Sequence, residues 1–283
     1  MSGAFKATLW GTRGSLASPG PETMQYGGNT SCVSVEGEDG TILVLDAGTG
    51  IRRLGLALPH TLKRVDLLLT HLHMDHIQGL GFFKPIRTGG VEVHIWGPAS
   101  TTQTLAARLS RYLSPPLFPV FLRELECDLH LHQVPCGDFQ IGQFHVSSAL
   151  ICHPDPSVGF RISTDRATMA YLPDHEPVLG SRDFSVPPDW ISGSCLVKHA
   201  DLLIHDTQYT DAEYAERVGW GHSSIRHAVQ FAALNGVKRL VTFHHDPSHT
   251  DADLDQMVET ARRESIAPPI VEPGKEGTTF ELA

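Results

Sequence analysis

The length, composition and charge of the chain already exclude several classes of protein. Its 283 residues are 41% hydrophobic and 19% charged, which allows a large core and excludes a disordered chain or a coiled coil. The formal net charge of −10 argues against a protein that binds nucleic acid mainly by neutralising phosphates. No apolar run reaches the roughly 18 residues of a membrane span, and no signal-peptide core occurs near the N-terminus, so we expect no membrane contact.

Cysteine and histidine usage indicates a reducing compartment and metal chemistry. The five cysteines, an odd number, include no Cys-x-x-Cys pair, which favours reduced thiols in the cytoplasm over a disulfide framework or a zinc ribbon. Histidine occurs 17 times, and its imidazole is a common metal ligand and catalytic base. The placement of the histidines is therefore the feature that needs an explanation.

The first half of the chain is predicted to alternate strands with helices. Apolar or alternating runs predict strands at residues 5–10, 31–36, 41–45, 65–70 and 91–96. Helical spacing of apolar side chains predicts helices at residues 51–58 and 101–113, and a proline-rich loop is expected at 114–119.

The second half continues in the same way. Strands are predicted at residues 144–152, 158–164, 167–172, 200–204 and 237–243. Helices are predicted at residues 224–234 and 251–266, and the proline-containing segment 173–188 is expected to be a loop. Because strands alternate with helices and no long polar linker interrupts them, we predict an α/β chain with a single domain, residues 1–283.

The strongest motif, His-x-His-x-Asp-His, directly follows the strand at 65–70. It places four potential metal ligands within six residues: His71, His73, Asp75 and His76. The first two histidines would point to the same side of an extended segment, whereas the aspartate and the third histidine begin a helix and are offset from them. This arrangement suits two metal ions rather than one closed tetrahedral site, and imidazole with carboxylate ligands favours Zn, Mn or Fe over Ca or Mg.

At this motif the sequence resembles the metallo-β-lactamase superfamily. Four further segments narrow the resemblance: Asp-Ala-Gly-Thr-Gly at 46–50, Leu-Ile-His-Asp at 203–206, Gly-His-Ser at 221–223 and Phe-His at 243–244. They are similar to a branch of phosphodiesterases that includes the tRNA 3′-processing endonuclease RNase Z and the cyclic-phosphate phosphodiesterase of phosphonate breakdown. The resemblance covers nearly the whole chain and implies the four-layer αβ/βα metallo-β-lactamase sandwich, with two central mixed sheets and helices outside.

The resemblance implies three further metal ligands, each just after a strand. The mid-chain histidine is assigned to His153, with His145 as the competitor inside the strand. A carboxylate shared by both ions is assigned to Asp174, although the family more often has Gly-Asp-Thr where this chain has Pro-Asp-His. The last ligand is assigned to His244 rather than to the adjacent His245, because neighbouring side chains of an extended chain point to opposite sides.

The resemblance also implies how the ligands divide between the ions. One ion would be held by His71, His73 and His153, and the other by Asp75, His76 and His244, with Asp174 shared. The expected cofactors are two divalent metal ions, zinc in the first place, with manganese or iron as alternatives.

Three residues are expected to act on the substrate or on water. The resemblance implies that His222 donates a proton or holds the phosphate, and that Asp206, where RNase Z-like enzymes commonly carry Glu, orients its imidazole. The alternatives are a loop histidine beside the helix at 224–234 and an acid with a structural role. Asp75 would orient the attacking water while it also binds a metal ion. Arg13 and Asn29 lie on loops that are candidates to approach a substrate.

These residues predict a dinuclear metal hydrolase, and specifically a phosphodiesterase in which metal-activated hydroxide attacks phosphorus. RNase Z-type enzymes grip tRNA with a long arm between the mid-chain histidine and the shared aspartate, where this chain has only the 20 residues 154–173. We therefore expect no tRNA-binding arm and a small or cyclic, nucleotide-like diester as substrate. The resemblance also implies a homodimer.

Two other functions stay open on the sequence. One is a metallo-hydrolase of another bond, in a lactone, a thioester or a β-lactam. The other is a non-catalytic metal-binding member of the fold. The pair of His222 and Asp206 favours the phosphodiesterase over both, because its resemblance is to the phosphodiesterase branch.

Overall fold

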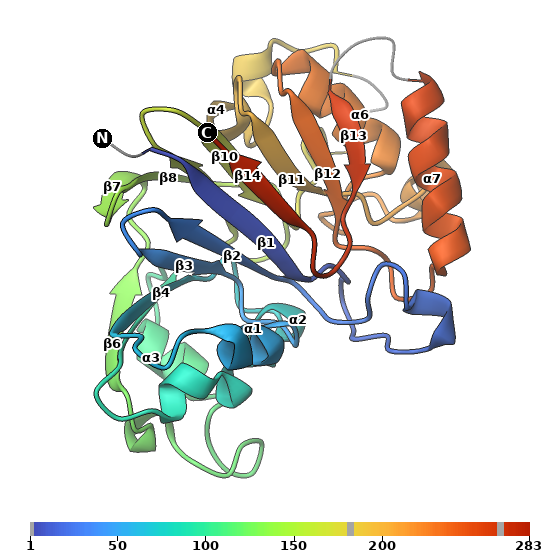
Figure 1. Ribbon diagram of the computed structural model, residues 1–283. Coiled ribbons are helices and arrows are strands. Elements are labelled where there is room, and N and C mark those ends of the chain that lie inside the picture. The colour runs from blue at the N-terminus through green and yellow to red at the C-terminus, as the bar shows by residue number, and fades with distance from the viewer. Residues whose placement is uncertain (1–2, 180–183, 265–268) are drawn as a thin grey trace.

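Two seven-stranded sheets pack face to face, and helices cover their outer faces, in a computed structural model that describes residues 3–179, 184–264 and 269–283 (Figure 1). The first half of the chain builds one sheet with the helices beside it, and the second half builds the other. The last strand returns to the first sheet and lies beside the first strand (Figure 1). The predicted four-layer αβ/βα sandwich is confirmed.

The first sheet is mixed, with strand order β14-β1-β2-β3-β4-β5-β6. Its strands are β1 (Phe5–Gly11), β2 (Cys32–Gly37), β3 (Ile42–Leu45), β4 (Arg64–Leu68), β5 (Glu92–Gly97), β6 (Asp128–Gln133) and β14 (Thr279–Leu282). The pairs from β14 to β3 are antiparallel, and the pairs from β3 to β6 are parallel.

The second sheet repeats this plan, with strand order β13-β12-β11-β10-β9-β8-β7. Its strands are β7 (Gly137–Ile141), β8 (Phe144–Leu150), β9 (Val158–Ser163), β10 (Thr168–Leu172), β11 (Leu202–Asp206), β12 (Arg239–Phe243) and β13 (Ile270–Pro273). The pairs from β7 to β10 are antiparallel, and the pairs from β10 to β13 are parallel.

The helices are short except for the last two. The α-helices are α1 (Ile51–Ala57), α2 (Met74–Ile77), α3 (Leu105–Leu109), α4 (Ser194–Val197), α5 (Asp211–Glu216), α6 (Ile225–Leu234) and α7 (Asp251–Glu264). The 3₁₀ turns are η1 (Pro21–Thr23), η2 (Leu80–Phe82), η3 (Lys84–Arg87), η4 (Leu122–Glu124) and η5 (Pro188–Trp190). No helix among the described residues is long and apolar enough to cross a membrane.

Three apolar layers hold the sheets and helices together. Between the sheets, every second residue of a strand is buried, as Phe5, Ala7 and Leu9 of β1 are against Phe144 and Phe160. A second layer lies between the first sheet and α1 and α3, and a third lies between the second sheet and α4, α6 and α7. Because helices cover much of the outer faces of the sheets, the strand ends are a place where polar side chains can gather.

The strand predictions agree with the structure to within two residues at each end, and the helices at 51–58 and 224–234 to within one. The helix predicted at 101–113 is only α3, which Thr104 caps and which gives way to turns after Leu109. The helix predicted at 251–266 ends at Glu264 as α7, and its last two positions lie outside the described residues. The strands β6, β7, β13 and β14 were missed, because β6 and β7 carry few apolar residues and the other two have four residues each.

The parallel strands of both sheets end at the same edge of the molecule, and this edge carries the polar residues singled out above. His71 follows β4 in the first sheet, and Asp174 and His244 follow β10 and β12 in the second. Asp206 is the last residue of β11. Because these strands end at one edge, histidines and aspartates from distant parts of the chain form one cluster there.

Arg13 joins the two sheets just behind this cluster. Its side chain is fully buried and donates to the carbonyls of Gly27 at 3.0 Å, Asp246 at 3.0 Å and His249 at 2.7 Å. Its backbone forms bridges with the segment before β2 and with the segment after β12. The guanidinium of Arg13 is thus engaged by backbone carbonyls, and the side-chain amide of Asn29 donates to Glu276 at 2.9 Å, which leaves neither candidate directed at a substrate.

Replacing Arg13 should destabilise the fold strongly. We expect Arg13→Ala to lower the free energy of unfolding by about 3 kcal/mol, because it leaves one buried and two part-buried carbonyls without this donor. Urea denaturation of the metal-depleted protein measures this change. The matched control is Arg226→Ala, whose ion pair with Asp211 is half exposed on both sides, and whose cost should stay below about 1 kcal/mol. Equal losses in the two variants would contradict a joining role for Arg13.

Candidate metal centre

The His-x-His-x-Asp-His segment forms the loop after β4 and the start of α2. His73 is the N-cap of α2, and its extended backbone separates the first two histidines from Asp75 and His76 in the helix. Three of the four side chains are buried, and His73 is partly exposed. The local geometry therefore has the offset that the spacing predicts.

All seven predicted ligands lie in two adjoining groups. One group is His71, His73 and His153, and the other is Asp75, His76, Asp174 and His244, and within each group the candidate ligand atoms lie within 4.8 Å of one another. Asp174 lies between the groups. Its Oδ2 is 3.0 Å from His76 Nε2, and its Oδ1 is 3.2 Å from His244 Nε2 and 3.8 Å from His71 Nε2. Two further groups of candidate ligand atoms include His222, one with His153 and Asp174 and one with Asp206 and His244, so the division between two ions stays a prediction.

Partners outside the cluster orient His76 and His153. The buried carboxylate of Asp46 accepts a hydrogen bond from Nδ1 of His76 at 2.8 Å. The carbonyl of Gly221 accepts from Nδ1 of His153 at 2.9 Å. Since each Nδ1 carries the proton, the Nε2 lone pair of each ring faces the cluster, which is the tautomer a metal ligand needs.

The same logic applies to the other three rings. Thr70 Oγ1 donates to Asp46 and so accepts from Nδ1 of His71 at 3.0 Å. Gln208 Oε1 accepts from Nδ1 of His244 at 2.9 Å. His73 is reversed, with Nε2 3.5 Å from Asp155 and Nδ1 toward the cluster, 3.3 Å from His153 Nε2. In all five histidines, the ring nitrogen without a proton thus faces the cluster.

Burial and mutual charge shift the protonation of this cluster. Burial disfavours a charged His244, but Asp174 and Asp75 outweigh it and raise the pKa of His244 to about 9. Burial also opposes charge on Asp174, yet the imidazoles of His244 and His76 hold its pKa well below its usual range. For His71, burial and the nearby His76 lower the pKa well below its usual value. The cluster therefore favours a positive charge beside Asp174, which protons or cations can supply.

The donor set fits divalent ions. His71 Nε2 is buried and has no hydrogen-bond partner among the described residues, and the buried Asp174 Oδ2 has only His76 Nε2 close by, at 3.0 Å. Converging lone pairs and carboxylates repel one another unless a cation lies between them. Imidazole and carboxylate ligands suit zinc, manganese or iron.

His244 and His245 face opposite ways, as expected, although the backbone at His244 is left-handed rather than extended. His244 faces the cluster, whereas His245 donates from Nε2 to the carbonyl of Gly274 at 3.0 Å and packs edge-on against Tyr26. A side chain at Gly14 would meet the His244 ring at 2.2 Å, so the glycine makes room for the imidazole. His244 itself has a left-handed backbone, φ 57°, which turns its ring inward.

His222 and Asp206 form a hydrogen-bonded pair at the edge of the cluster. Asp206 Oδ2 accepts from His222 Nδ1 at 2.7 Å, and the ring of His222 stacks on that of His244 with centroids 5.0 Å apart. His222 Nδ1 is also 3.9 Å from Asp174 Oδ1. The structure thus brings His222 beside the predicted ligands, with its Nδ1 hydrogen-bonded to Asp206.

Four residues that orient the cluster were missed or left unassigned on the sequence. Asp46 orients the ring of His76, and Gln208 orients that of His244. The hydroxyl of Thr70 lies between Asp46 and His71 and hydrogen-bonds to both. Glu176 is fully buried and accepts from the backbone amides of Gly219 and Gly221, both in the loop that carries His222. Only Asp46, in the Asp-Ala-Gly-Thr-Gly segment, lay in a motif; the others have no sequence signal because their role depends on contacts between distant segments.

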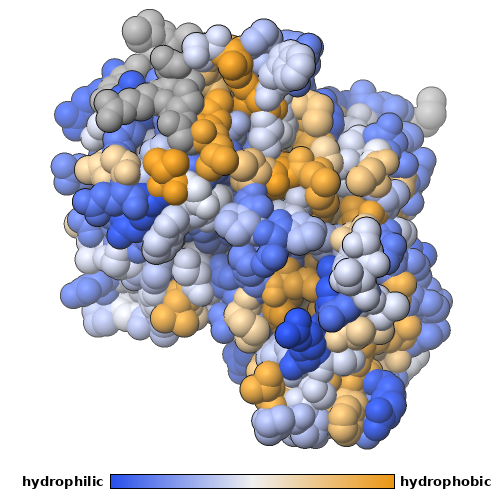
Figure 2. All heavy atoms as spheres, turned by 180° about the vertical axis from the view of Figure 1, so that it is seen from behind, coloured by the Kyte–Doolittle hydropathy of each residue, from blue (hydrophilic) through white to orange (hydrophobic). Residues whose placement is uncertain are grey.

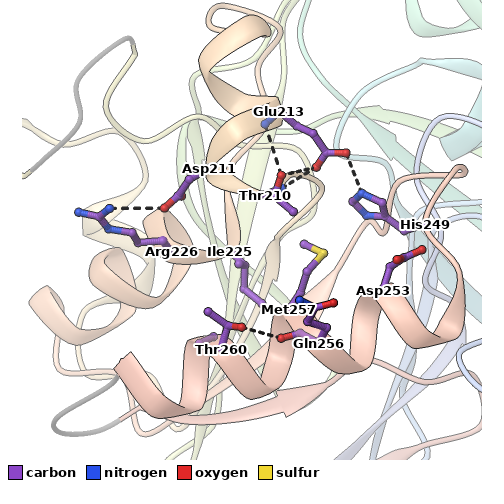
Figure 3. Close-up of a pocket in the computed structure, with 11 residues that line it drawn as sticks. Thr210, Asp211, Glu213, Ile225, Arg226, His249, Asp253, Gln256, Met257 and Thr260 are labelled. Carbon is purple, nitrogen blue, oxygen red and sulfur yellow. Dashed lines mark hydrogen bonds and ion pairs between the residues drawn. The ribbon is translucent and has the colours of Figure 1, made fainter.

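A pocket of about 450 Å³ opens beside the cluster and shares His73 with it. The view from behind shows a recess between two lobes of the molecule, where hydrophilic residues meet a hydrophobic patch (Figure 2). A second pocket lies elsewhere, between α5, α6 and α7, and contains none of the predicted ligands (Figure 3). Of these two pockets, only the one at His73 adjoins the cluster.

Comparisons with known proteins agree with this geometry. A family model described as "Beta-lactamase superfamily domain" matches residues 41–245. The sequence is similar to a protein of Gemmatimonas aurantiaca named ribonuclease Z, with 26% identity over 309 aligned positions that cover 92% of each chain. The fold is similar to that of the metallo-beta-lactamase fold protein YhfI from Bacillus subtilis, with a TM-score of 0.69, 19% identity and 99% of both chains covered. It is also similar to a structure described as a new diphosphatase from the PhnP family, with a TM-score of 0.69, 18% identity and coverage of 99% and 98%.

Metal content should separate the two adjacent histidines. We expect His244→Gln to lose about one metal ion per chain, since it removes a ligand from one ion only. His245→Gln is the matched control and should keep the wild-type content, because its ring faces Gly274. Elemental analysis after purification with excess zinc measures both. A loss in His245→Gln with retention in His244→Gln would contradict the assignment.

Proposed function

Because the chain belongs to the beta-lactamase superfamily, we propose that it is a dinuclear metal-dependent phosphodiesterase that acts on small diesters. The observation that carries this proposal is the His222–Asp206 pair, 2.7 Å between Nδ1 and Oδ2, beside two groups of metal-ligating side chains. Ligands for two ions supply the means to activate water, and the pair supplies a proton donor next to them.

The ligands named above would hold the ions, His71, His73 and His153 on one side and Asp75, His76 and His244 on the other, with Asp174 between. Two divalent ions, zinc or else manganese or iron, would lower the pKa of water and neutralise charge on the phosphate. Asp75 Oδ2 is held by the backbone amide of Ser15 at 2.7 Å, so its carboxylate is fixed where it can orient water.

His222 would protonate the leaving alkoxide. Its Nδ1 donates to Asp206, so a proton on Nε2 is the one it can transfer. Asp206 is itself held by the backbone amides of Gln208 at 2.9 Å and His175 at 3.2 Å, which fixes the imidazole plane. Glu176 anchors the loop that presents His222, through Gly221. A fixed donor beside the phosphate needs no rearrangement during the reaction.

Two observations support a small substrate. The residues between His153 and Asp174 are used for β9, β10 and the tight turn that joins them, in which Thr164 N donates to Ala167 O at 3.0 Å. The net charge of −10 disfavours a long polyanion, whose many phosphates are repelled together, more than a small diester.

Processing of tRNA is the second candidate, because the Gemmatimonas aurantiaca relative is named ribonuclease Z. A precursor tRNA with a 3′ extension should therefore be assayed beside bis(p-nitrophenyl) phosphate, cyclic mononucleotides, a lactone and a β-lactam. Turnover of precursor tRNA far above that of every small diester would replace our proposal. Turnover of the lactone or β-lactam alone would contradict a phosphodiesterase.

The leaving group tests the role of His222. His222→Ala should lower turnover about a hundredfold or more for a diester with an alkyl leaving group, because the alkoxide needs a proton. The loss should be much smaller with a p-nitrophenyl leaving group, since p-nitrophenolate departs without help. Asp206→Asn should also lower turnover more for the alkyl leaving group than for p-nitrophenyl, but both losses should be smaller than in His222→Ala.

Metal content is the control for that experiment. If His222→Ala keeps the wild-type metal content and loses activity on both leaving groups equally, then His222 is not the acid. If it loses the metals, then His222 is a ligand and the assignment of the two groups is wrong.

A further inference from the structure

Glu176 is a buried carboxylate that forms no ion pair with any described residue. Its side chain is held by neutral donors: the hydroxyl of Tyr214 in α5 at 2.7 Å, and the backbone amides of Gly219 at 3.1 Å and Gly221 at 3.0 Å. A buried carboxylate is costly unless donors surround it. The loop that supplies the two amides is therefore held firmly to this one side chain.

The two glycines give the loop a shape that surrounds the carboxylate. Gly219 and Gly221 both have left-handed φ, 87° and 84°. In turns that contain left-handed residues, backbone amides can converge on one side and form a concave site for an anion. Here the anion in the concavity is a carboxylate of the protein itself, two residues after Asp174.

The backbone of Gly221 connects Glu176 to both parts of the metal centre. Its amide donates to Glu176, and its carbonyl accepts from Nδ1 of His153 at 2.9 Å. The next residue is His222, whose Nδ1 lies 2.7 Å from Asp206. A movement of this one residue would thus displace a predicted metal ligand and the proposed proton donor together.

Backbone contacts fix Glu176 against the same two segments of the chain. Its own amide donates to the carbonyl of Cys152 at 2.9 Å, one residue before His153. Ser223 Oγ donates to the carbonyl of His175 at 2.6 Å, one residue before Glu176. The carboxylate is therefore a fixed point to which the loop is attached.

We propose that Glu176 is a positioning residue that couples the proton donor to the metal ion on the side of His153. The inference rests on the proposed function and deepens it. With the carboxylate in place, Gly221 holds the His153 ring with Nε2 toward the ion and presents His222 beside the phosphate. Without it, two backbone amides lose their buried acceptor, and the ligand and the donor are displaced together.

Zinc binding tests the metal side of this coupling without any turnover. We expect Glu176→Gln to lower the affinity for one of the two ions about tenfold and to leave the other near the wild-type value. The reason is that the loop hydrogen-bonds to His153 and to no other predicted ligand within the described residues. Tyr214→Phe, which removes one of the three donors, should cause a smaller loss at the same ion. Competition with a chromophoric chelator measures both affinities.

The matched control is Glu276→Gln. Glu276 is also a nearly buried carboxylate, but it accepts from Asn29 and Arg53 and contacts none of the predicted ligands. Its replacement should keep both zinc affinities. On the donor side, Glu176→Gln should lower turnover of a diester with an alkyl leaving group more than that of a p-nitrophenyl ester, because only the former needs His222.

Chemical rescue separates positioning from general damage to the fold. Glu176→Ala leaves the concavity without its anion, so added formate should bind there and restore part of the lost zinc affinity. The wild type and Glu276→Ala in the same formate, and Glu176→Ala in chloride of equal ionic strength, should show no gain.

The outcomes distinguish this inference from the proposed function. If no diester is turned over, but Glu176→Gln weakens one ion and formate rescues Glu176→Ala, the coupling stands and the phosphodiesterase falls. If diesters are turned over, and Glu176→Gln keeps both zinc affinities and the wild-type dependence on the leaving group, the coupling is overturned and the phosphodiesterase stands. Equal losses at both ions, or the same loss in Glu276→Gln, would also overturn the coupling.

Discussion

The buried carboxylate of Asp46 is the contact on which both the metal centre and the joining of the two sheets depend. It follows β3 in the first sheet and accepts a hydrogen bond from the hydroxyl of Tyr171 in β10 of the second sheet, at 3.0 Å. It also accepts from His76 and from the amide of Thr70, both at 2.8 Å. A buried carboxylate is costly unless donors surround it, so the segments that supply these donors are held together. The same donors fix the rings of two ligands.

Backbone conformation at the strand ends serves the same purpose. Asp46 and His244 both adopt left-handed φ, 59° and 57°, which non-glycine residues rarely do. Each conformation redirects a side chain from the strand toward the cluster, and the surrounding hydrogen bonds offset its cost. Gly14 and Gly221 complete the arrangement, because a side chain at either would collide with a histidine ring.

Charge is distributed unevenly over the chain. The chain is acidic as a whole, with a net charge of −10, yet five histidines gather in the cluster at the strand ends. Long-range repulsion acts on a polyanion, whereas a compact phosphate compound meets cations only at short range, where screening is weak. The proposed preference for a small diester therefore rests both on the net charge and on where the charges lie.

The sequence by itself determined the buried strands, the two long helices and the ligand motif, because these depend on periodicity and on short spacings. It placed His71, His73, Asp75 and His76 together from six consecutive residues, and the ordering of the remaining ligands came from the resemblance. The edge strands β6, β7, β13 and β14 carried too weak a pattern, since pairing with a neighbour rather than burial defines them.

Only the tertiary structure decided which polar residues support the site. Glu176, Gln208 and Thr70 act through hydrogen bonds to segments tens of residues away, and Arg13 proved to bind buried carbonyls. The physical reason is the same for all of these residues. The local sequence determines which polar groups are present, and the packing of distant segments determines which of these groups come within hydrogen-bond distance of one another.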